Sequence, residues 1–75
     1  METIIKRIKL LMNKNGVNEN ILAKDLDIPL NHIEKILQGK VEPKANLLIK
    51  LSIYFSCTID YLVGFSDNEN KHRVI

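Results

Sequence analysis

The chain is short of several residue types, and each shortage excludes a class of protein. Its 75 residues include one cysteine and no tryptophan. Cys57 cannot form an internal disulfide, which argues against a disulfide-stapled secreted scaffold and is typical of a reducing cytoplasm. We expect this cysteine to be a small buried apolar residue rather than a reactive thiol.

Long apolar runs are missing too. No stretch reaches the roughly 18 consecutive apolar residues that a transmembrane helix needs. Residues 2–15 mix charged and apolar side chains at helical spacing, which is not the pattern of a signal peptide. The composition, 45% hydrophobic and 27% charged, is that of a globular domain. We therefore expect one small cytoplasmic domain, whose core supplies about 5 kcal/mol of stability or less.

A strong net charge is absent as well, since the formal net charge is +2. Residues 18–38 carry four acids and two lysines, whereas residues 1–17 have a net charge of +3 and residues 39–56 one of +2. Any attraction to phosphate groups must therefore come from the two basic flanks and from helix N-termini. The chain also has no Ser/His/Asp set, no glycine-rich phosphate loop and no Cys/His metal spacing. We expect no enzyme activity, no metal and no cofactor.

What the sequence does contain is a helix-break-helix pattern in residues 18–39. Its apolar residues recur at spacings typical of helices that lie on a core, at Ile21, Leu22, Leu26, Ile28, Ile33, Ile36 and Leu37. Pro29 lacks an N–H and disfavours the helical conformation at Ile28, so no helix can run through this corner. Two short amphipathic helices around such a break predict a helix-turn-helix.

Five helices are expected along the chain, over about residues 3–14, 19–26, 29–38, 44–55 and 59–63. Their expected N-caps are Thr3, Asn18 and Thr58, and their expected stops are Gly16, Gly39 and Gly64. The helix over residues 44–55 is apolar almost all round and should be central in the bundle. We take residues 1–65 as the folded domain and residues 66–75 as a polar, flexible C-terminal tail.

The third helix has two candidate starts. Pro29 can occupy its first position, or Asn31 can cap it with Glu34 as the partner of a capping box. We favour the earlier start, because Leu30 otherwise loses its helical context.

Six short pieces of the sequence, in order and in register, carry a resemblance to a known family. They are Ile8-x-x-Leu11, Gly16-Val17-Asn18, Leu22-Ala23-x-x-Leu26-x-Ile28, Ile33-x-x-Ile36, Gly39-Lys40 with Pro43, and Ile59-Asp60-Tyr61-Leu62-Val63-Gly64. Over residues 4–64 the chain resembles the Cro/C1-type helix-turn-helix family, the DNA-binding domain of phage repressors and many bacterial regulators. The resemblance implies an all-α, compact five-helix, lambda-repressor-like bundle.

Several positions in the helix-turn-helix depart from the family's usual residues. Glu19 stands where a glutamine usually contacts the DNA, and a carboxylate repels phosphate although it can accept from cytosine N4. Asp27 replaces the turn glycine, which the corner should tolerate because Asp adopts the left-handed conformation more readily than most residues. Pro29 replaces a Ser/Thr cap, and Leu30 takes a first-turn reading position that is usually polar.

A further departure affects two positions at once. The family often pairs an arginine late in its first helix with a glutamate near the end of its third, and the matching residues here are Met12 and Leu37. Removing one member of a buried ion pair costs about 3–5 kcal/mol, whereas an apolar replacement of both can be neutral or better. We therefore predict a contact between Met12 and Leu37.

The resemblance also implies which residues contact DNA. The base-reading candidates are Leu30, Asn31, His32 and Lys35, with Gln38 at the end of the helix. Asn can pair with adenine, Lys can donate to guanine, and Leu can touch a thymine methyl. Each of the polar residues is otherwise a solvated side chain. For Leu30 the alternatives are a hydrophobic contact to a protein partner and packing back onto the core.

Other family contacts map onto the flanks of the helix-turn-helix and onto the last helix. Candidates for phosphate contacts are Asn18, Asn20, Lys40 and Lys44. Asn18 is otherwise an N-cap, and the two lysines are otherwise loop residues in solvent. Tyr61 and Phe65 are candidates for dimer contacts, with core closure as the alternative for Tyr61.

Two hypotheses for the function follow. The first is a sequence-specific DNA-binding transcriptional regulator, similar to a phage or bacterial repressor, which binds double-stranded operator DNA as a homodimer with residues 29–38 in the major groove. The alternative is a protein-interaction module with the same fold, such as an antirepressor or a regulator-binding subunit. The acidic helix pair, Glu19 and Leu30 motivate the alternative.

Overall fold

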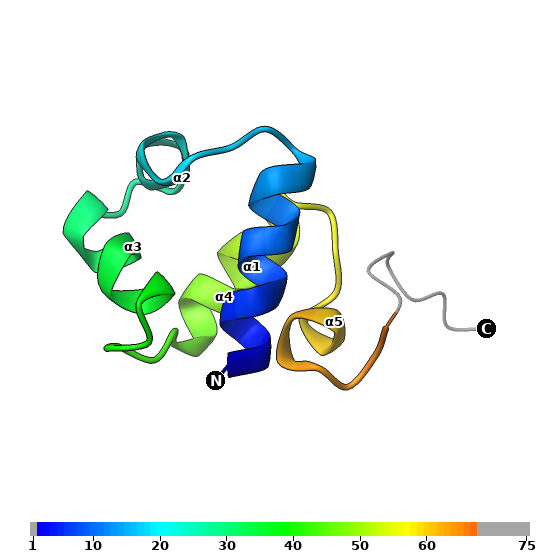
Figure 1. Cartoon of the computed structure of the whole chain (residues 1–75). Coiled ribbons are helices and arrows are strands. Elements are labelled where there is room, and N and C mark those ends of the chain that lie inside the picture. The colour runs from blue at the N-terminus through cyan, green and yellow to red at the C-terminus, as the bar shows by residue number, and fades with distance from the viewer. Residues whose placement is uncertain (1, 68–75) are drawn as a thin grey trace.

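The computed structural model describes residues 2–67 of the chain, and this part contains five helices and no strand (Figure 1). The helices are α1 (Glu2–Lys14), α2 (Glu19–Leu26), α3 (Leu30–Leu37), α4 (Ala45–Tyr54) and α5 (Ile59–Val63). The predicted all-α, five-helix architecture is therefore confirmed. None of these helices is long and apolar enough to cross a membrane.

The helices pack in two groups that share one core. α2 packs against α3, while α1 packs against α5 and α5 against α4; α1 also touches α3 and so joins the groups. Figure 1 shows α2 and α3 on one side of α1 and α5 on the other. The most deeply buried side chains of the core are Ile8, Leu11, Leu22, Ile36, Leu51, Cys57 and Leu62. Cys57 is 1% exposed, so the predicted buried cysteine is confirmed.

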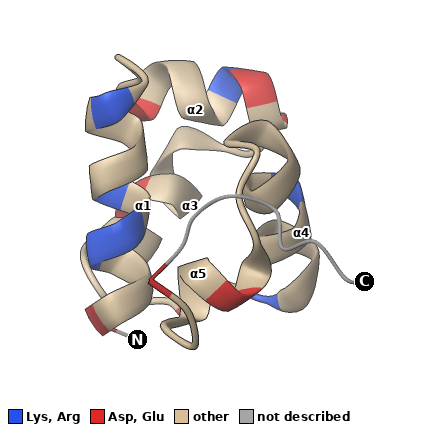
Figure 2. Ribbon diagram, turned by 90° about the vertical axis from the view of Figure 1, so that its right-hand side faces the viewer, with Lys and Arg blue, Asp and Glu red and all other residues tan. Residues whose placement is uncertain are grey.

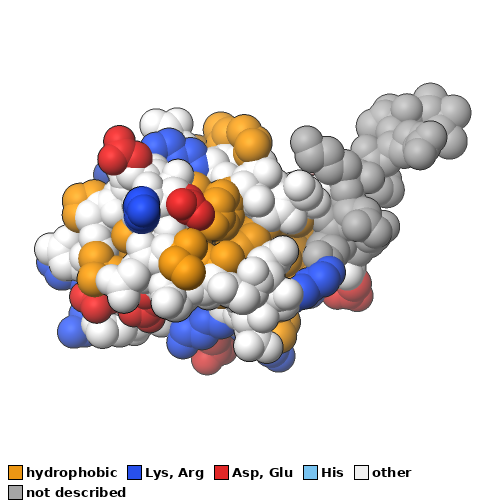
Figure 3. Space-filling model, turned by 90° about the horizontal axis from the view of Figure 1, so that it is seen from above, with side chains coloured by type: hydrophobic (Ala, Val, Ile, Leu, Met, Phe, Trp, Pro, Cys, Tyr) orange, Lys and Arg blue, Asp and Glu red, His pale blue; other side chains and the backbone are white. Residues whose placement is uncertain are grey.

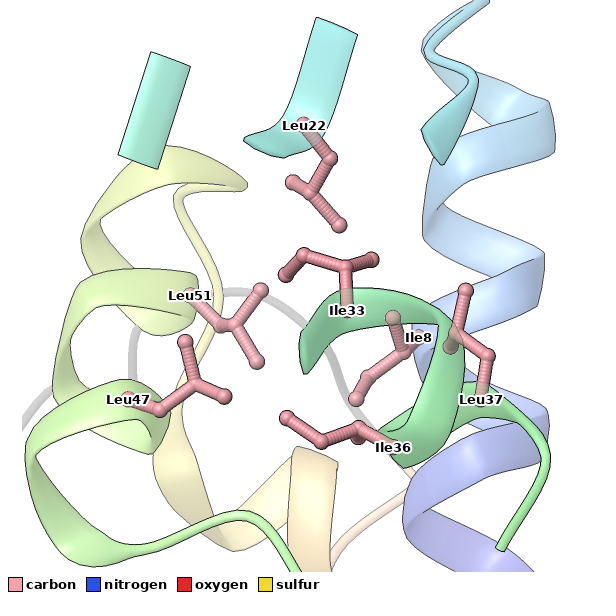
Figure 4. A pocket seen from close by; sticks show the side chains of 7 residues that line it. All are labelled: Ile8, Leu22, Ile33, Ile36, Leu37, Leu47 and Leu51. Carbon is pink, nitrogen blue, oxygen red and sulfur yellow. The ribbon is translucent and has the colours of Figure 1, made fainter. Parts of the chain in front are cut away.

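The centre of this core is filled by apolar side chains from four helices. Figure 4 shows residues of α1, α2, α3 and α4 pointing toward one another around a cavity of about 10 Å³. A space of that size is at the lower limit for a single water molecule, and an apolar lining gives a water nothing to bond. The centre is therefore a packed core rather than a ligand site.

Local sequence signals explain most helix ends. The Asn18 Oδ1 accepts a hydrogen bond from the N–H of Ile21 at 2.8 Å, which caps α2. In the same way, Thr58 Oγ1 accepts from the N–H of Tyr61 at 3.0 Å and caps α5. The predicted caps Asn18 and Thr58 are thus confirmed. Thr3 is not a cap, because α1 already begins at Glu2 and includes it.

The corner of the helix-turn-helix has the expected form. Asp27 adopts the left-handed conformation, with φ 56° and ψ 48°, so an aspartate does serve where the family uses glycine. α3 begins at Leu30, and the carbonyl of Pro29 accepts from the N–H groups of His32 and Ile33. The earlier of the two candidate starts is therefore right, although Pro29 lies one position before the first helical residue.

The prediction that α4 is central in the bundle is wrong for half of the helix. Leu47 and Leu51 are buried, but Ile49 and Ile53 are 45% and 67% exposed. α4 therefore has an inner face on the core and an outer face in solvent. An all-round apolar pattern did not distinguish these two faces, because Ile49 and Ile53 are as hydrophobic as the residues inside.

Met12 and Leu37 are both buried, at 7% and 6% exposed, within the same core. The core leaves no charge stranded at the positions where relatives often place an ion pair. The direct contact between the two side chains stays a prediction.

Candidate nucleic-acid interface

The outer face of α3 is built by helical spacing. Ile33, Ile36 and Leu37 turn into the core, which leaves the opposite side of the helix in solvent. Asn31, Lys35 and Gln38 recur on that side at spacings of four and three residues and are all exposed. Two amides and an ammonium group thus lie in one row, and each is a side chain that can hydrogen-bond to base edges.

The residues at the edges of this row differ in exposure. Glu34 is half-buried on one edge, and His32 is exposed on the other. Leu30 is also half-buried and packs against the core. Of the three alternatives for Leu30, packing back onto the core is the one that the structure shows. The base contact predicted for Leu30 stays a prediction, and only the exposed part of this side chain could make it.

The candidate phosphate contacts lie at the start of α2 and between α3 and α4. Asn20, Lys40 and Lys44 are exposed, and Lys44 occupies the N-cap position of α4. Asn18 is exposed too, but its Oδ1 is engaged by the N–H of Ile21. Its Nδ2 can still donate to an acceptor such as a phosphate oxygen. Each predicted residue is thus accessible to a partner.

The acidic residues of the helix-turn-helix do not all face the same way. Asp25 is directed at α4, where its Oδ2 accepts from the hydroxyl of Tyr54 at 2.5 Å. This hydrogen bond raises the pKa of Tyr54 above its usual value, with smaller contributions from burial and from the negative charge of Asp25. Lys50, also on α4, donates to the carbonyl of Leu26 at 3.3 Å. One of the four acids in residues 18–38 is therefore held away from the outer face of α3.

The face of the molecule seen in Figure 3 is of mixed charge. Seen from above, it shows acidic, basic and hydrophobic side chains side by side rather than a broad basic patch (Figure 3). This agrees with the net charge of +2. Since the net charge is this small, we expect binding to DNA to depend on individual lysines and amides.

Comparison with known families decides what kind of domain carries this interface. Residues 7–68 match the model of the Cro/C1-type HTH DNA-binding domain. The chain belongs to the Cro/C1-type family. No match was found among curated proteins or among solved structures.

One residue of this Cro/C1-type domain has a role that the sequence did not reveal. Arg7 belongs by sequence to the basic N-terminal flank, but its side chain is only 17% exposed. Its Nη1 donates to the carbonyls of Tyr61 at 2.8 Å and Ser66 at 2.5 Å, and its Nη2 lies 3.1 Å from Oδ1 of Asp67. The guanidinium also stacks over the Tyr61 ring, 4.3 Å from its centre. Arg7 is therefore committed to the fold and is not available to phosphate.

The two candidates for dimer contacts in the Cro/C1-type domain are placed differently. Tyr61 is 9% exposed, under the guanidinium of Arg7, so it closes the core and offers little surface to a second copy. The proposed dimer contact through Tyr61 is therefore withdrawn. Phe65 is 85% exposed and keeps its candidacy.

The folded part of the chain reaches further toward the C-terminus than residue 65, where the sequence analysis ends the domain. Ser66 and Asp67, which their composition assigns to the tail, are tied to α1 through the side chain of Arg7. In Figure 2 the described chain ends in an acidic residue, where the grey trace begins. The folded part of the Cro/C1-type domain thus extends at least to Asp67. The rest of the predicted tail lies outside the described residues.

Proposed function

We propose that this Cro/C1-type protein is a sequence-specific transcriptional regulator, similar to a repressor, that acts in the cytoplasm on operator DNA. α3 enters the major groove, and a homodimer reads two half-sites about 34 Å apart. The observation that supports this most is the row of Asn31, Lys35 and Gln38 on the exposed face of α3. Within residues 2–67, no hydrogen bond or ion pair engages these three side chains.

Each residue of the row has a chemical role in this proposal. Asn31 and Gln38 each pair with an adenine by donating to N7 and accepting from the N6 amino group, or donate to another base edge. Lys35 donates to O6 or N7 of a guanine. His32 contacts a phosphate or a base at the edge of the interface.

Affinity comes from contacts to the sugar-phosphate backbone on either side of α3. Lys40 and Lys44 supply positive charge beyond its C-terminal end, and the amides of Asn18 and Asn20 donate at the start of α2. Glu19 is half-buried at the same end of α2. Its carboxylate repels phosphate groups unless it accepts a hydrogen bond from the N4 amino group of a cytosine. The operator should therefore be bound with modest affinity and marked dependence on sequence.

The alternative function is a protein-interaction module of the same fold. Leu30 supports it only weakly, because this side chain packs in part on the core. The exposed Ile49 and Ile53 on the outer face of α4 now favour it instead. A pull-down that recovers a protein partner, with loss of binding in Ile53→Asp and no DNA shift, would replace the first proposal with this one.

The proposed function is tested by selecting bound sequences from DNA of the protein's own locus and titrating salt. A regulator that contacts phosphates loses affinity steeply as salt rises. Lys40→Ala should weaken binding to all sequences and lower the salt slope by about one unit. Lys9→Ala is the matched control, since it removes one positive charge from an exposed position on α1. No binding to own-locus DNA at low salt would reject the proposal.

A further inference from the structure

Two side chains of α4 reach across to the last turn of α2. The hydroxyl of Tyr54 donates to Oδ2 of Asp25 at 2.5 Å, and Nζ of Lys50 donates to the carbonyl of Leu26 at 3.3 Å. Tyr54 and Lys50 are four residues apart on α4, so they lie on one face of that helix. Their partners are the last two residues of α2. Both bonds therefore hold the end of α2 that leads into the corner of the helix-turn-helix.

The bond from Lys50 also completes the C-terminal end of α2. The last carbonyls of a helix have no partner within it and need one from outside. The corner supplies part of this need, because the N–H groups of Asp27 and Ile28 donate to carbonyls in the last turn of α2. The carbonyl of Leu26 instead accepts from the ammonium group of Lys50, 24 positions further along the chain. A cation at this end of a helix also interacts favourably with the helix dipole.

Apart from these two bonds, α2 meets α4 through apolar side chains. Within residues 2–67, α2 packs closely against α3 only. It reaches α4 in the core, where Leu22 lines the same small space as Leu47 and Leu51 (Figure 4). Apolar burial is non-directional, and the preferred crossing angles of packed helices scatter by about 15–20°. Hydrogen bonds are directional, so the bonds from α4 are the contacts that can fix the angle of α2 more closely.

We propose that Lys50 and Tyr54 are positioning residues for base reading: they hold the end of α2, and with it α3, at the angle that presents the exposed row on α3 to DNA. This role rests on the proposed reading of DNA by α3 and adds two residues that need not touch DNA themselves. α2 and α3 pack on each other and are joined by three residues, so a tilt of α2 is passed on to α3. A binding site must hold its side chains within roughly 0.5 Å and 10–20° of the productive geometry.

The location of the two bonds suits this role better than a role in stability. Lys50 is exposed and Tyr54 is half-buried, and together with Leu26 and Ile53 they line a groove that is open to solvent. Polar contacts in such a place contribute little to the free energy of unfolding. Removing either bond should therefore leave the fold intact while the angle of α2 and α3 changes.

The first test measures the angle between α3 and α4 in the full chain, without DNA, from residual dipolar couplings. Tyr54→Phe and Lys50→Met should each turn α3 by about 10° or more relative to α4. Ser52→Ala is the matched control for Tyr54→Phe, because it removes a hydroxyl from α4 that donates within that helix, to the carbonyl of Ile49. Lys9→Met is the control for Lys50→Met, since Lys9 is an exposed lysine of α1. Neither control should change the angle.

The second test measures the ratio of the dissociation constants for a selected operator and for the same operator with the contacted base pair changed. Tyr54→Phe and Lys50→Met should each reduce this discrimination about fivefold, and the two controls should not. A purely structural role would weaken binding to both DNAs equally and leave the ratio unchanged. Asp25→Asn keeps an oxygen that accepts from the Tyr54 hydroxyl and should discriminate like wild type. Asp25→Ala, which removes the same charge, should lose discrimination as Tyr54→Phe does.

The outcomes separate this inference from the function on which it rests. A wild type that binds DNA without discriminating between sequences rejects the proposed function, and this inference falls with it. If wild type discriminates and both Tyr54→Phe and Lys50→Met discriminate as well, the inference is overturned while α3 still reads DNA. Reduced discrimination without any change of angle also overturns it, because the two residues then do not act by positioning α3. Asp25→Ala removes the same bond from its other partner and provides both measurements if Tyr54→Phe does not fold.

Discussion

Polar side chains have different roles where α1 meets α5 and on the outer face of α3. Where α1 meets α5, Arg7 joins the helices through backbone carbonyls and an aromatic ring, and its side chain is largely buried. On α3, by contrast, Asn31, Lys35 and Gln38 extend into solvent from a helix that is anchored by its apolar face. The side chains that maintain the fold and those proposed to read DNA are therefore separate sets. Substitutions in the first set should therefore change stability, and substitutions in the second set should change DNA reading but leave stability unchanged.

Among the substitutions that test this separation, the largest change in the free energy of unfolding is expected on the buried face of α3. Ile36 is 2% exposed, and Ile36→Ala should lower the free energy of unfolding by about 2–5 kcal/mol, through lost burial and the cavity left behind. In so small a domain this approaches the whole stability. Urea denaturation followed by circular dichroism measures it. Lys35→Ala, one residue away, should change the free energy of unfolding by less than about 0.5 kcal/mol; a comparable loss there would contradict the separation.

A smaller effect is expected at the left-handed turn on the α1–α5 side. Gly64→Ala should lower the free energy of unfolding by about 1–2 kcal/mol, because φ 94° is strained for any residue with a Cβ atom. The new Cβ would also press on Thr3 Cγ2 at 3.1 Å. Thermal unfolding of the two proteins measures the difference.

The substitution matched to Gly64→Ala is Asp27→Gly, at the corner of the helix-turn-helix, because it removes a Cβ atom from a left-handed residue instead of adding one. Asp27 already carries a side chain at φ 56°, so Asp27→Gly should relieve strain and raise the melting temperature. A loss of stability in Asp27→Gly, or no loss in Gly64→Ala, would show that backbone conformation does not determine the effect of substitutions at these two positions.

The smallest expected effect is the dependence of stability on pH at Tyr54. The pKa of Tyr54 is raised in the folded state by its hydrogen bond to Asp25, so the neutral hydroxyl is favoured by folding. The stabilisation is therefore fully present below the ordinary tyrosine value of 10.0 and is lost as pH rises through the higher folded value. Urea denaturation from pH 9 to 11 should show a steeper decline for wild type than for Tyr54→Phe. Equal slopes would mean that the hydrogen bond does not persist in solution.

The parts of the fold that sequence could predict are those that depend on near neighbours. Asn18 and Thr58 accept from N–H groups three residues ahead, and Gly64 ends a helix by its own backbone conformation. The apolar spacing of α2 and α3 likewise needs only a few turns of sequence. These signals located all five helices.

The parts that sequence missed depend on contacts between distant segments. Arg7 reaches Ser66 across 59 positions of the chain, and nothing in a run of basic residues marks one of them as buried. For Leu30 and Tyr61 the sequence left core packing and an exposed contact as alternatives, since helical spacing shows that a residue is apolar but not which neighbour covers it.

The central claim is that the exposed row on α3 reads base sequence. The most direct measurement compares wild type and Lys35→Ala on a selected operator and on the same operator with the contacted base pair changed. Wild type should discriminate between the two sites by about 1–3 kcal/mol, and Lys35→Ala should lose that discrimination while keeping the rest of its affinity. If Lys35→Ala, and then Asn31→Ala and Gln38→Ala at their own base pairs, all discriminate as well as wild type, α3 does not read the operator and the account is wrong.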